Sequence, residues 1–204
     1  MKIFCYDIQR PLSAQELACI SEERRTYADS YRFPDDRMRC LAAGYLLSAY
    51  LGRSAQLYVG KYGKLYTSVD NLFFNLSHAG RYVVLAIADR EVGIDIEPIT
   101  AYDDAVARKC FTQSEYLLMN TQASNDAFFK LWTAKESVMK ACGKGFYLPP
   151  ESFELQMGEQ PVCVADDRLW HIRWLEFNGH ILCTAVEQTP EPLELVFCGH
   201  TPFK

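Results

Sequence analysis

One helical segment constrains the fold and the function of this chain more strongly than any other part of the sequence. The residues from 129 to 145 read FKLWTAKESVMKACGKG and lie in a helix predicted near 126–142. Trp132, Glu136 and Lys140 are four residues apart, so an aromatic ring, an acid and a base share one face of that helix. Because a core stripe does not carry Glu and Lys, this face predicts a surface that holds a metal and phosphate. The ordinary alternative is a Glu to Lys pair on a solvated helix, worth about 0.2–0.5 kcal/mol.

A second pattern lies upstream, where residues 92–98 read VGIDIEP. Apolar and acidic residues alternate, which predicts a strand with Ile94 and Ile96 in the core and with Asp95 and Glu97 on the opposite face. Two like charges on one face repel each other unless a cation lies between them or water surrounds them. Hard oxygen ligands of this kind suit Mg²⁺ better than Zn²⁺. A hairpin strand with a solvated face is the alternative.

The two patterns together predict one metal site. Glu136 would add a third carboxylate to the strand pair, and the cation would bridge the protein and a phosphorylated ligand. A third segment, FNLSHAG, places Ser77 and His78 at the end of an apolar strand. With Lys64 and Lys140, His78 would surround a pyrophosphate with cationic and donor groups. The alternative for a lone histidine is a purely structural role.

These motifs resemble those of the surfactin-synthetase-type 4'-phosphopantetheinyl transferases. In that family, a Gly-x-Asp-x-Glu strand is followed along the chain by Trp-x-x-Lys-Glu-x-x-x-Lys, and the resemblance covers most of this chain. The matching residues are Gly93, Asp95 and Glu97, followed by Trp132, Lys135, Glu136 and Lys140. Supporting motifs in the family's order and approximate spacing are Tyr62-Gly63-Lys64, Asn75-x-Ser77-His78 and Phe111-x-x-x-Glu115.

The resemblance implies an α+β fold of two similar α/β halves in a pseudo-twofold arrangement. Residues 1–99 would form the N-terminal half and residues 100–204 the C-terminal half, with the active site at their interface. The implied reaction transfers 4'-phosphopantetheine from coenzyme A to a serine of an apo acyl or peptidyl carrier protein, or of a carrier domain in a peptide, polyketide or fatty-acid synthase. Mg²⁺ or Mn²⁺ is the expected cofactor, coenzyme A the donor substrate, and a monomer the expected state.

The resemblance also assigns roles to individual residues. Asp95, Glu97 and Glu136 are the expected metal ligands. Glu136 is in addition the candidate general base toward the serine, directly or through a metal-bound water, and Lys140, His78 and Lys64 would stabilise the leaving phosphate. The residues expected to bind coenzyme A, with the two arginines on its 3'-phosphate, are Arg32, Arg39, Lys64, Ser77, His78 and Lys140.

Hydrophobic periodicity predicts the remaining elements. In the first half, helices are expected near residues 13–27 and 35–51, and strands near residues 2–8, 57, 73 and 82–88. In the second half, helices are expected near residues 104–110 and 112–121, and strands near residues 153, 169–176, 180–187 and 193–197.

Composition narrows the class of protein. The 204 residues, 49% of them hydrophobic, are enough for one good-sized core or two small ones. Because no apolar run reaches the roughly 18 residues of a membrane span, and the N-terminus MKIFCYDIQRP reads as a strand and a turn, we expect no membrane association, no signal sequence and a cytoplasmic location. The net charge of −5 argues against nucleic-acid binding. Eight scattered cysteines favour buried free thiols over disulfides or a zinc site.

Two other functions stay open. A Mg²⁺-dependent phosphohydrolase acting on a nucleotide pyrophosphate would use the same acids and lysines, with water as the acceptor. A noncatalytic protein that binds a carrier protein or coenzyme A would keep the same fold. In the segment FTQSEY, Phe111, Glu115 and Tyr116 resemble the family's stretch beside the carrier-binding surface, whereas Thr112 and Glu115 also fit a capping box at the start of a helix.

Overall fold

The structure, a computed structural model, describes residues 1–52, 55–121, 125–188 and 193–198. None of the helices in these ranges has the length and apolar character needed to cross a membrane. The first half of the chain contains β1 (Lys2–Asp7), α1 (Ala14–Cys19), α2 (Glu22–Ala28), α3 (Pro34–Tyr50), β2 (Leu57–Val59), β3 (Leu65–Thr67), β4 (Phe73–Ala79) and β5 (Tyr82–Ala88). Strand β6 (Val92–Pro98) follows, and the second half of the chain contains α4 (Asp104–Cys110), α5 (Gln113–Thr121), α6 (Asp126–Cys142), η1 (Gly145–Tyr147), η2 (Pro150–Ser152), β7 (Leu155–Gln156), β8 (Val162–Ala165), β9 (Arg168–Phe177), β10 (His180–Glu187) and β11 (Glu194–Phe197).

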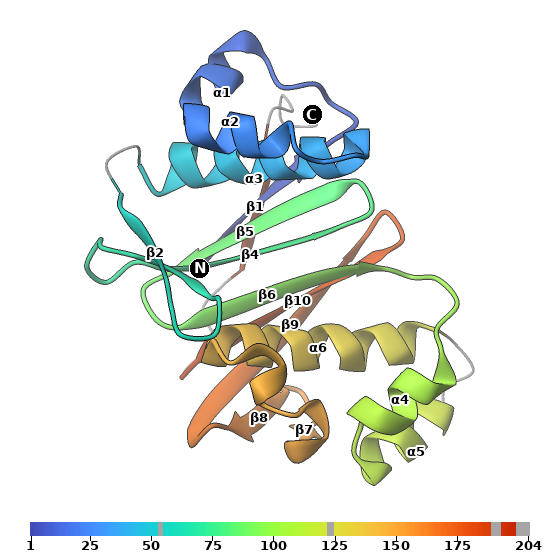
Figure 1. The fold of residues 1–204 in the computed structure, drawn as a ribbon. Helices are drawn as coiled ribbons and strands as arrows, with labels where there is room; N and C mark the ends of the chain where they lie inside the picture. Colours follow the sequence, from blue (N-terminus) through green and yellow to red (C-terminus); the bar gives the residue numbers. More distant parts are fainter. Residues whose placement is uncertain (53–54, 122–124, 189–192, 199–204) are drawn as a thin grey trace.

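The two larger sheets and the helices α3 and α6 stack in four layers, which Figure 1 shows from the side. Helix α3 covers the outer face of a sheet ordered β11-β1-β5-β4, and α6 covers the outer face of a sheet ordered β6-β10-β9-β8-β7. The inner faces pack on each other through a shared core, to which Ile3 and Val84 contribute from the first sheet and Ile94 and Leu182 from the second. Alternate residues such as Phe4 face α3 instead, because side chains in a strand alternate between its two faces.

The two sheets share a connectivity. In the first, β1 pairs antiparallel with β5, which pairs with β4; in the second, β6 pairs antiparallel with β10, which pairs with β9. Along the sequence, α3 lies between β1 and the β4–β5 hairpin, and α6 lies between β6 and the β9–β10 hairpin. Each of these long helices covers its own sheet. The predicted α+β fold is confirmed, and the repeated strand order is what a two-half arrangement requires.

Two strands cross the expected boundary at residue 99. Strand β11, near the C-terminal end, pairs parallel with β1, with Glu194 opposite Lys2. Strand β6 precedes the boundary but belongs to the second sheet, with Asp95 opposite Cys183 of β10. The sheets therefore do not follow the two sequence ranges, and the division into residues 1–99 and 100–204 stays a prediction.

Local departures from the predicted elements have local causes. The helix expected near residues 13–27 is two helices, because Ile20 is extended and the Ser21 hydroxyl accepts the backbone N–H of Arg24 at 3.2 Å, which starts α2. The strand expected near residue 153 begins at Leu155, because Pro150 first opens a short 3-10 turn. The short strands β3 and β8 were not predicted.

Candidate active site between the two sheets

Strand β6 and helix α6 approach each other very closely at Gly93. A Cβ atom at this position would lie 1.9 Å from the backbone oxygen of Ser137 and 2.5 Å from the backbone nitrogen of Ala141. Among the amino acids, only glycine lacks that atom, so only glycine permits this contact. The close approach places Asp95 and Glu97, which follow on the same face of the strand, against α6.

Replacing Gly93 with alanine should force β6 and α6 apart. Because the new methyl group would overlap backbone atoms, which no side-chain rotation can move, we expect the free energy of unfolding to fall by about 1–3 kcal/mol or more. Urea denaturation followed by circular dichroism measures this loss. Gly158→Ala is the matched control, because a Cβ atom there would meet nothing within 4 Å. Equal stability of the two variants would show that the close approach is not needed.

Three side chains from three elements meet where the edge strands β4 and β6 lie near α6. The Nζ atom of Lys140 on α6 lies 2.6 Å from Oδ1 of Asp95 on β6 and 3.0 Å from Oγ of Ser77 on β4. The Ser77 hydroxyl donates to the same Oδ1 at 2.9 Å. We call these three residues the Asp95 cluster. Asp95 is 3% exposed, and its second oxygen, Oδ2, is buried without a hydrogen-bond partner, so one acceptor remains for a ligand.

Glu97 and Glu136 extend the negative charge of this cluster. Burial raises the pKa of Glu97 to about 7, and the charge of Asp95 adds to the rise, while a hydrogen bond from Trp132 opposes it. Burial also raises the pKa of Glu136; Lys140 opposes this rise and Asp95 adds to it. Each glutamate is thus more costly to ionise beside Asp95, and a shared cation would relieve that cost.

The three expected metal ligands reach one region without forming a coordination site. Across the described ranges, no three His, Cys, Asp or Glu side chains are close enough together to hold a metal ion. The ammonium group of Lys140 neutralises Asp95 instead. The donors nevertheless fit a hard divalent cation, because all are carboxylates and the buried Oδ2 of Asp95 has no partner.

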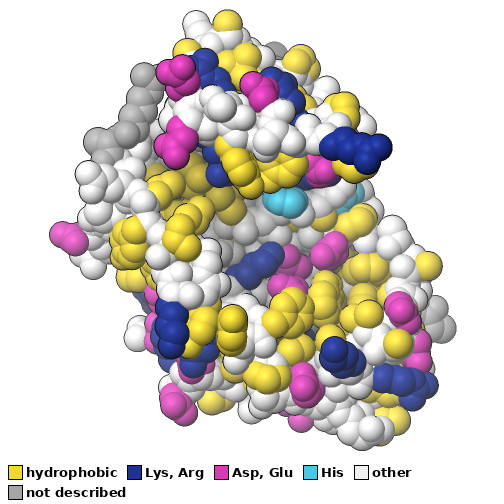
Figure 2. All heavy atoms as spheres, viewed as in Figure 1, with side chains coloured by type: hydrophobic (Ala, Val, Ile, Leu, Met, Phe, Trp, Pro, Cys, Tyr) yellow, Lys and Arg dark blue, Asp and Glu magenta, His cyan; other side chains and the backbone are white. Residues whose placement is uncertain are grey.

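Cationic and donor groups border the cluster on the side of the first sheet. Arg39 on α3 donates from Nη1 to the backbone oxygen of Gly80 at 2.6 Å, two residues beyond His78. Partial burial lowers the pKa of His78, as do the charges of Arg39 and Lys140. The charges of Arg39 and Lys140 thus act on His78, while Asp36, which pairs with Arg39 at 2.6 Å, opposes their effect on this pKa. Figure 2 shows histidine, basic and acidic side chains around a hollow between the two halves. Arg32 precedes α3 and is exposed.

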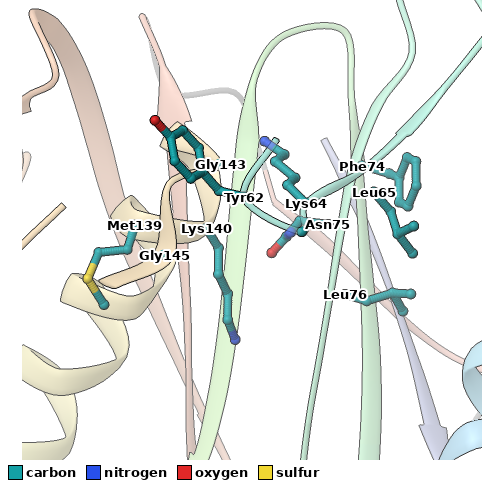
Figure 3. A pocket seen from close by; sticks show the side chains of 11 residues that line it. Tyr62, Lys64, Leu65, Phe74, Asn75, Leu76, Met139, Lys140, Gly143 and Gly145 are labelled. Atoms are coloured by element: carbon teal, nitrogen blue, oxygen red, sulfur yellow. The ribbon is translucent and has the colours of Figure 1, made fainter. Parts of the chain in front are cut away.

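The structure does not bring Lys64 to the Asp95 cluster. Its Nζ atom lies 2.6 Å from Oε2 of Glu91 and 2.7 Å from the backbone oxygen of Ala141, and its side chain is 5% exposed. In Figure 3 the ammonium groups of Lys64 and Lys140 point in opposite directions. Its charge is paired with Glu91, and the expectation that Lys64 binds phosphate stays a prediction. The sequence reasoning missed Glu91, whose signal was an acid directly before the strand β6.

Lys135 and the FTQSEY segment contribute to the core of the second half. Lys135 is fully buried, with its Nζ 2.7 Å from Oε2 of the equally buried Glu115. Glu115 accepts the backbone N–H of Thr112 at 2.8 Å, and the Thr112 hydroxyl accepts that of Glu115 at 3.3 Å, which forms the capping box. Phe111 is buried as well. The structure favours the capping interpretation over contact of Phe111 and Glu115 with a carrier protein.

Asn75 is a structural member of the site that the sequence identified only as part of a motif. Its Oδ1 atom accepts the backbone N–H of Ile94 at 3.0 Å. This bond joins β4 to β6, which belong to different sheets. Since Asn75 and Ser77 lie on the same face of β4, and Ile94 is next to Asp95, the bond holds Ser77 opposite Asp95. Two polar residues at i and i+2 of a strand that begins with apolar residues were the available signal.

A cavity of about 290 Å³ opens beside Lys140, between the turn that precedes β3 and the carboxyl end of α6 (Figure 3). A ligand that reaches the ammonium group of Lys140 therefore has room to extend into this cavity. The cavity is lined by Tyr62, Gly63, Lys64, Leu65, Phe74, Asn75, Leu76, Met139, Lys140, Gly143 and Gly145.

Comparison with known proteins bears on this geometry. Residues 91–185, which include the acidic strand and α6, match the model of the family described as the 4'-phosphopantetheinyl transferase superfamily (ACPS). The 4'-phosphopantetheinyl transferase gsp of Aneurinibacillus migulanus is 36% identical over 71% of this chain and 65% of that protein. The 4'-phosphopantetheinyl transferase Sfp of Bacillus subtilis (strain 168) is 32% identical over 96% of this chain and 97% of that protein.

A solved structure, the holo-(acyl-carrier-protein) synthase AcpS of Thermotoga maritima, matches 49% of this chain and 64% of that chain at 18% identity, with a TM-score of 0.43. The family assignment rests on the sequence matches, because the match to Sfp extends over nearly the full length of both proteins. This chain therefore belongs to the 4'-phosphopantetheinyl transferase superfamily.

Proposed function

We propose that this protein transfers the 4'-phosphopantetheine group of coenzyme A to a serine of a carrier protein and so converts the apo carrier into its holo form. The observation that carries the proposal is the Asp95 cluster, in which Lys140 bridges Asp95 and Ser77 between the two sheets. A lysine held between a carboxylate and a hydroxyl beside a cavity is suited to bind a pyrophosphate. The relatives, which are named 4'-phosphopantetheinyl transferases, agree with this reaction.

The acids and Lys140 have different roles in charge neutralisation. Asp95, Glu97 and Glu136 would hold Mg²⁺ or Mn²⁺ through carboxylate oxygens. When bound, the cation neutralises the negative charge of the pyrophosphate. Lys140, with His78 nearby, donates to the leaving phosphate and stabilises the charge that develops there. Phosphoryl transfer depends on such positioning and neutralisation more than on covalent help.

The transfer step moves one bond and one proton. The serine oxygen of the carrier bonds to the β-phosphorus of coenzyme A, while the bond from that phosphorus to the bridging oxygen breaks. The bridging oxygen keeps the electron pair, and 3',5'-adenosine bisphosphate leaves. Glu136 takes the hydroxyl proton, directly or through a water molecule. Burial raises the pKa of Glu136, whereas a bound cation would lower it, so a water molecule can serve as the relay.

The donor would be anchored by the cationic groups on the first half. Arg39 and Arg32 would bind the 3'-phosphate of coenzyme A, and His78, Ser77 and Lys140 would bind its pyrophosphate. Arg39 supports this proposal best, because its guanidinium is fixed between Oδ1 of Asp36 and the backbone oxygen of Gly80, next to the β4 end that carries His78.

Arg39→Ala should weaken binding of coenzyme A by about tenfold or more, because a charge-assisted hydrogen bond to phosphate is worth roughly 1.5–3 kcal/mol. Binding of 3'-dephospho-coenzyme A should change little, since this donor lacks the group that Arg39 contacts. Isothermal titration calorimetry with both donors measures the difference. Arg37→Ala is the matched control, because Arg37 lies on the same helix and pairs with Asp29. An equal loss for both donors would remove the 3'-phosphate assignment.

The acceptor would be an apo acyl or peptidyl carrier protein, free or as a carrier domain of a peptide, polyketide or fatty-acid synthase. We place the protein in the cytoplasm because all eight cysteines are free thiols and seven of them are buried, as suits a reducing compartment. We also propose that the protein works as a monomer.

The experiment that tests this function is intact-protein mass spectrometry of an apo carrier protein incubated with this protein, coenzyme A and Mg²⁺. A parallel sample contains EDTA. We expect the carrier to gain the mass of one phosphopantetheine group, and we expect the gain to disappear with EDTA. Breakdown of coenzyme A with no gain on several carriers would identify a hydrolase. No gain and no breakdown would identify a noncatalytic binder.

A further inference from the structure

One buried ammonium group joins three elements at the carboxyl end of α6. Lys64, in the turn before β3, donates from Nζ to Oε2 of Glu91 at 2.6 Å and to the backbone oxygen of Ala141 at 2.7 Å. Glu91 directly precedes β6, and Ala141 follows Lys140 in α6. A cation at this end of a helix also meets the negative end of the helix dipole, which strengthens the contact.

The surroundings of this joint are closely packed. Gly143 ends α6 in the left-handed conformation, with φ of 70°. A Cβ atom on Gly143 would lie 2.6 Å from the hydroxyl oxygen of Tyr66 and 3.0 Å from Cδ of Lys64. In addition, Gly93 of β6 lies against the backbone of Ala141. The last turn of α6 therefore contacts both β6 and the β3 region, which leaves it little freedom to slide.

We infer that Lys64 is a positioning residue, which fixes α6 relative to β6 and thereby holds Lys140 against Asp95, and that it is not a ligand of the substrate phosphates. Two acceptors already engage its ammonium group, which points away from that of Lys140 (Figure 3). Ala141, which accepts from Lys64, is adjacent to Lys140 in α6, and Glu91 precedes Asp95 by four residues. The contacts of Lys64 therefore lie close to both members of the Lys140–Asp95 pair. A small displacement of α6 would separate the pair that now stands at 2.6 Å.

The test compares Lys64→Met and Glu91→Gln with wild type, because both remove the ion pair but only the first removes a cation. Lys61→Met is the matched control, since Lys61 is an exposed lysine of the same turn whose ammonium lies over the ring of Tyr62. The double variant Lys64→Met/Glu91→Gln leaves no buried unpaired charge. It therefore tests the inference even if Lys64→Met alone does not fold.

Three readouts are needed: the Kd of coenzyme A by calorimetry, the kcat of transfer to an apo carrier, and hydrogen exchange of the amides of Gly143 and Lys144. The amide of Gly143 donates to the backbone oxygen of Lys140, and the amide of Lys144 donates to that of Met139. Both amides therefore report on the last turn of α6. For both single variants we expect Kd to change less than about threefold, kcat to fall by about tenfold or more, and exchange to accelerate by about tenfold. The double variant should be no worse than either single variant. Lys61→Met should match wild type.

The opposite pattern would overturn the inference. If Lys64→Met weakens coenzyme A binding by about tenfold or more while Glu91→Gln changes neither binding nor rate, Lys64 is a phosphate ligand. Unchanged exchange and unchanged kcat in both single variants would also contradict a positioning role. The kinetic part rests on the proposed function, whereas hydrogen exchange and coenzyme A binding do not. A wild-type protein without transferase activity would therefore refute the proposed function, and these two readouts would still decide the role of Lys64.

Discussion

Replacing Asp95 with asparagine should lower the rate of phosphopantetheine transfer by about 10³-fold while the protein stays folded, because several kcal/mol of charge stabilisation are lost at the reacting phosphate. Asparagine keeps an oxygen that accepts from Ser77 and Lys140, so the hydrogen bonds of the Asp95 cluster can persist. It removes the negative charge that neutralises Lys140 and that would hold a divalent cation. Steady-state kinetics with an apo carrier protein measures the rate, and circular dichroism measures the fold.

Asp89→Asn is the control for this prediction. Asp89 is an exposed acid just after β5, paired with Arg90, and its replacement should leave the rate within about twofold of wild type. Added Mg²⁺ should not restore the activity of the Asp95 variant, because the variant lacks one of the carboxylates that would bind the cation. If the Asp95 variant unfolds at the assay temperature, the aspartate is a structural acid and the proposed site is wrong in its central residue.

Lys135→Met should lower the free energy of unfolding by about 3–5 kcal/mol, because it leaves a buried carboxylate without its counter-charge. Glu115 is 2% exposed and would keep its bonds from the backbone N–H groups of Thr112 and Leu155, so it cannot turn toward water. Lys135 also donates to the backbone oxygens of Pro150 and Phe153, which lose their donor in the variant. The midpoint of urea denaturation measures the effect.

The matched control for this stability prediction lies on the same helix. Lys130 pairs with Glu176 at 2.7 Å, but both side chains are substantially exposed, so Lys130→Met should change stability by no more than about 0.5 kcal/mol. Adding Glu115→Gln to Lys135→Met should recover part of the loss, since the unpaired charge is then gone. Similar small losses for Lys130→Met and Lys135→Met would show that burial does not make the Lys135 pair essential.

The long helix and the acidic strand were predictable because their signals are local. Helix α6 has the expected bounds, Asp126–Cys142, and β6 has Ile94 and Ile96 fully buried with Asp95 on the opposite face. Both patterns depend only on the repeat of the backbone, which places side chains at i and i+4 of a helix, or at i and i+2 of a strand, on one face.

The ion-pair partners of the lysines were not predictable in the same way. Lys64, Lys135 and Lys140 all belong to motifs of the resemblance, and all three are paired with acids in the structure. Only Lys140 pairs with an acid of the expected metal set, whereas the partners Glu91 and Glu115 lie outside it. Which acid a lysine meets depends on how strands and helices pack, and motif spacing does not contain that information.

By itself, the sequence determined the α+β class, the strand and helix that carry the acids, the face on which they lie, and the resemblance to the phosphopantetheinyl transferases. Only the tertiary structure decided that β11 completes the first sheet, that Lys140 bridges Asp95 and Ser77, and that Lys64 is held at the end of α6. The physical reason is that periodicity reports which side chains share a face of one element. Contacts between elements depend on the packing of residues far apart in the chain, where a small shift decides which charges meet.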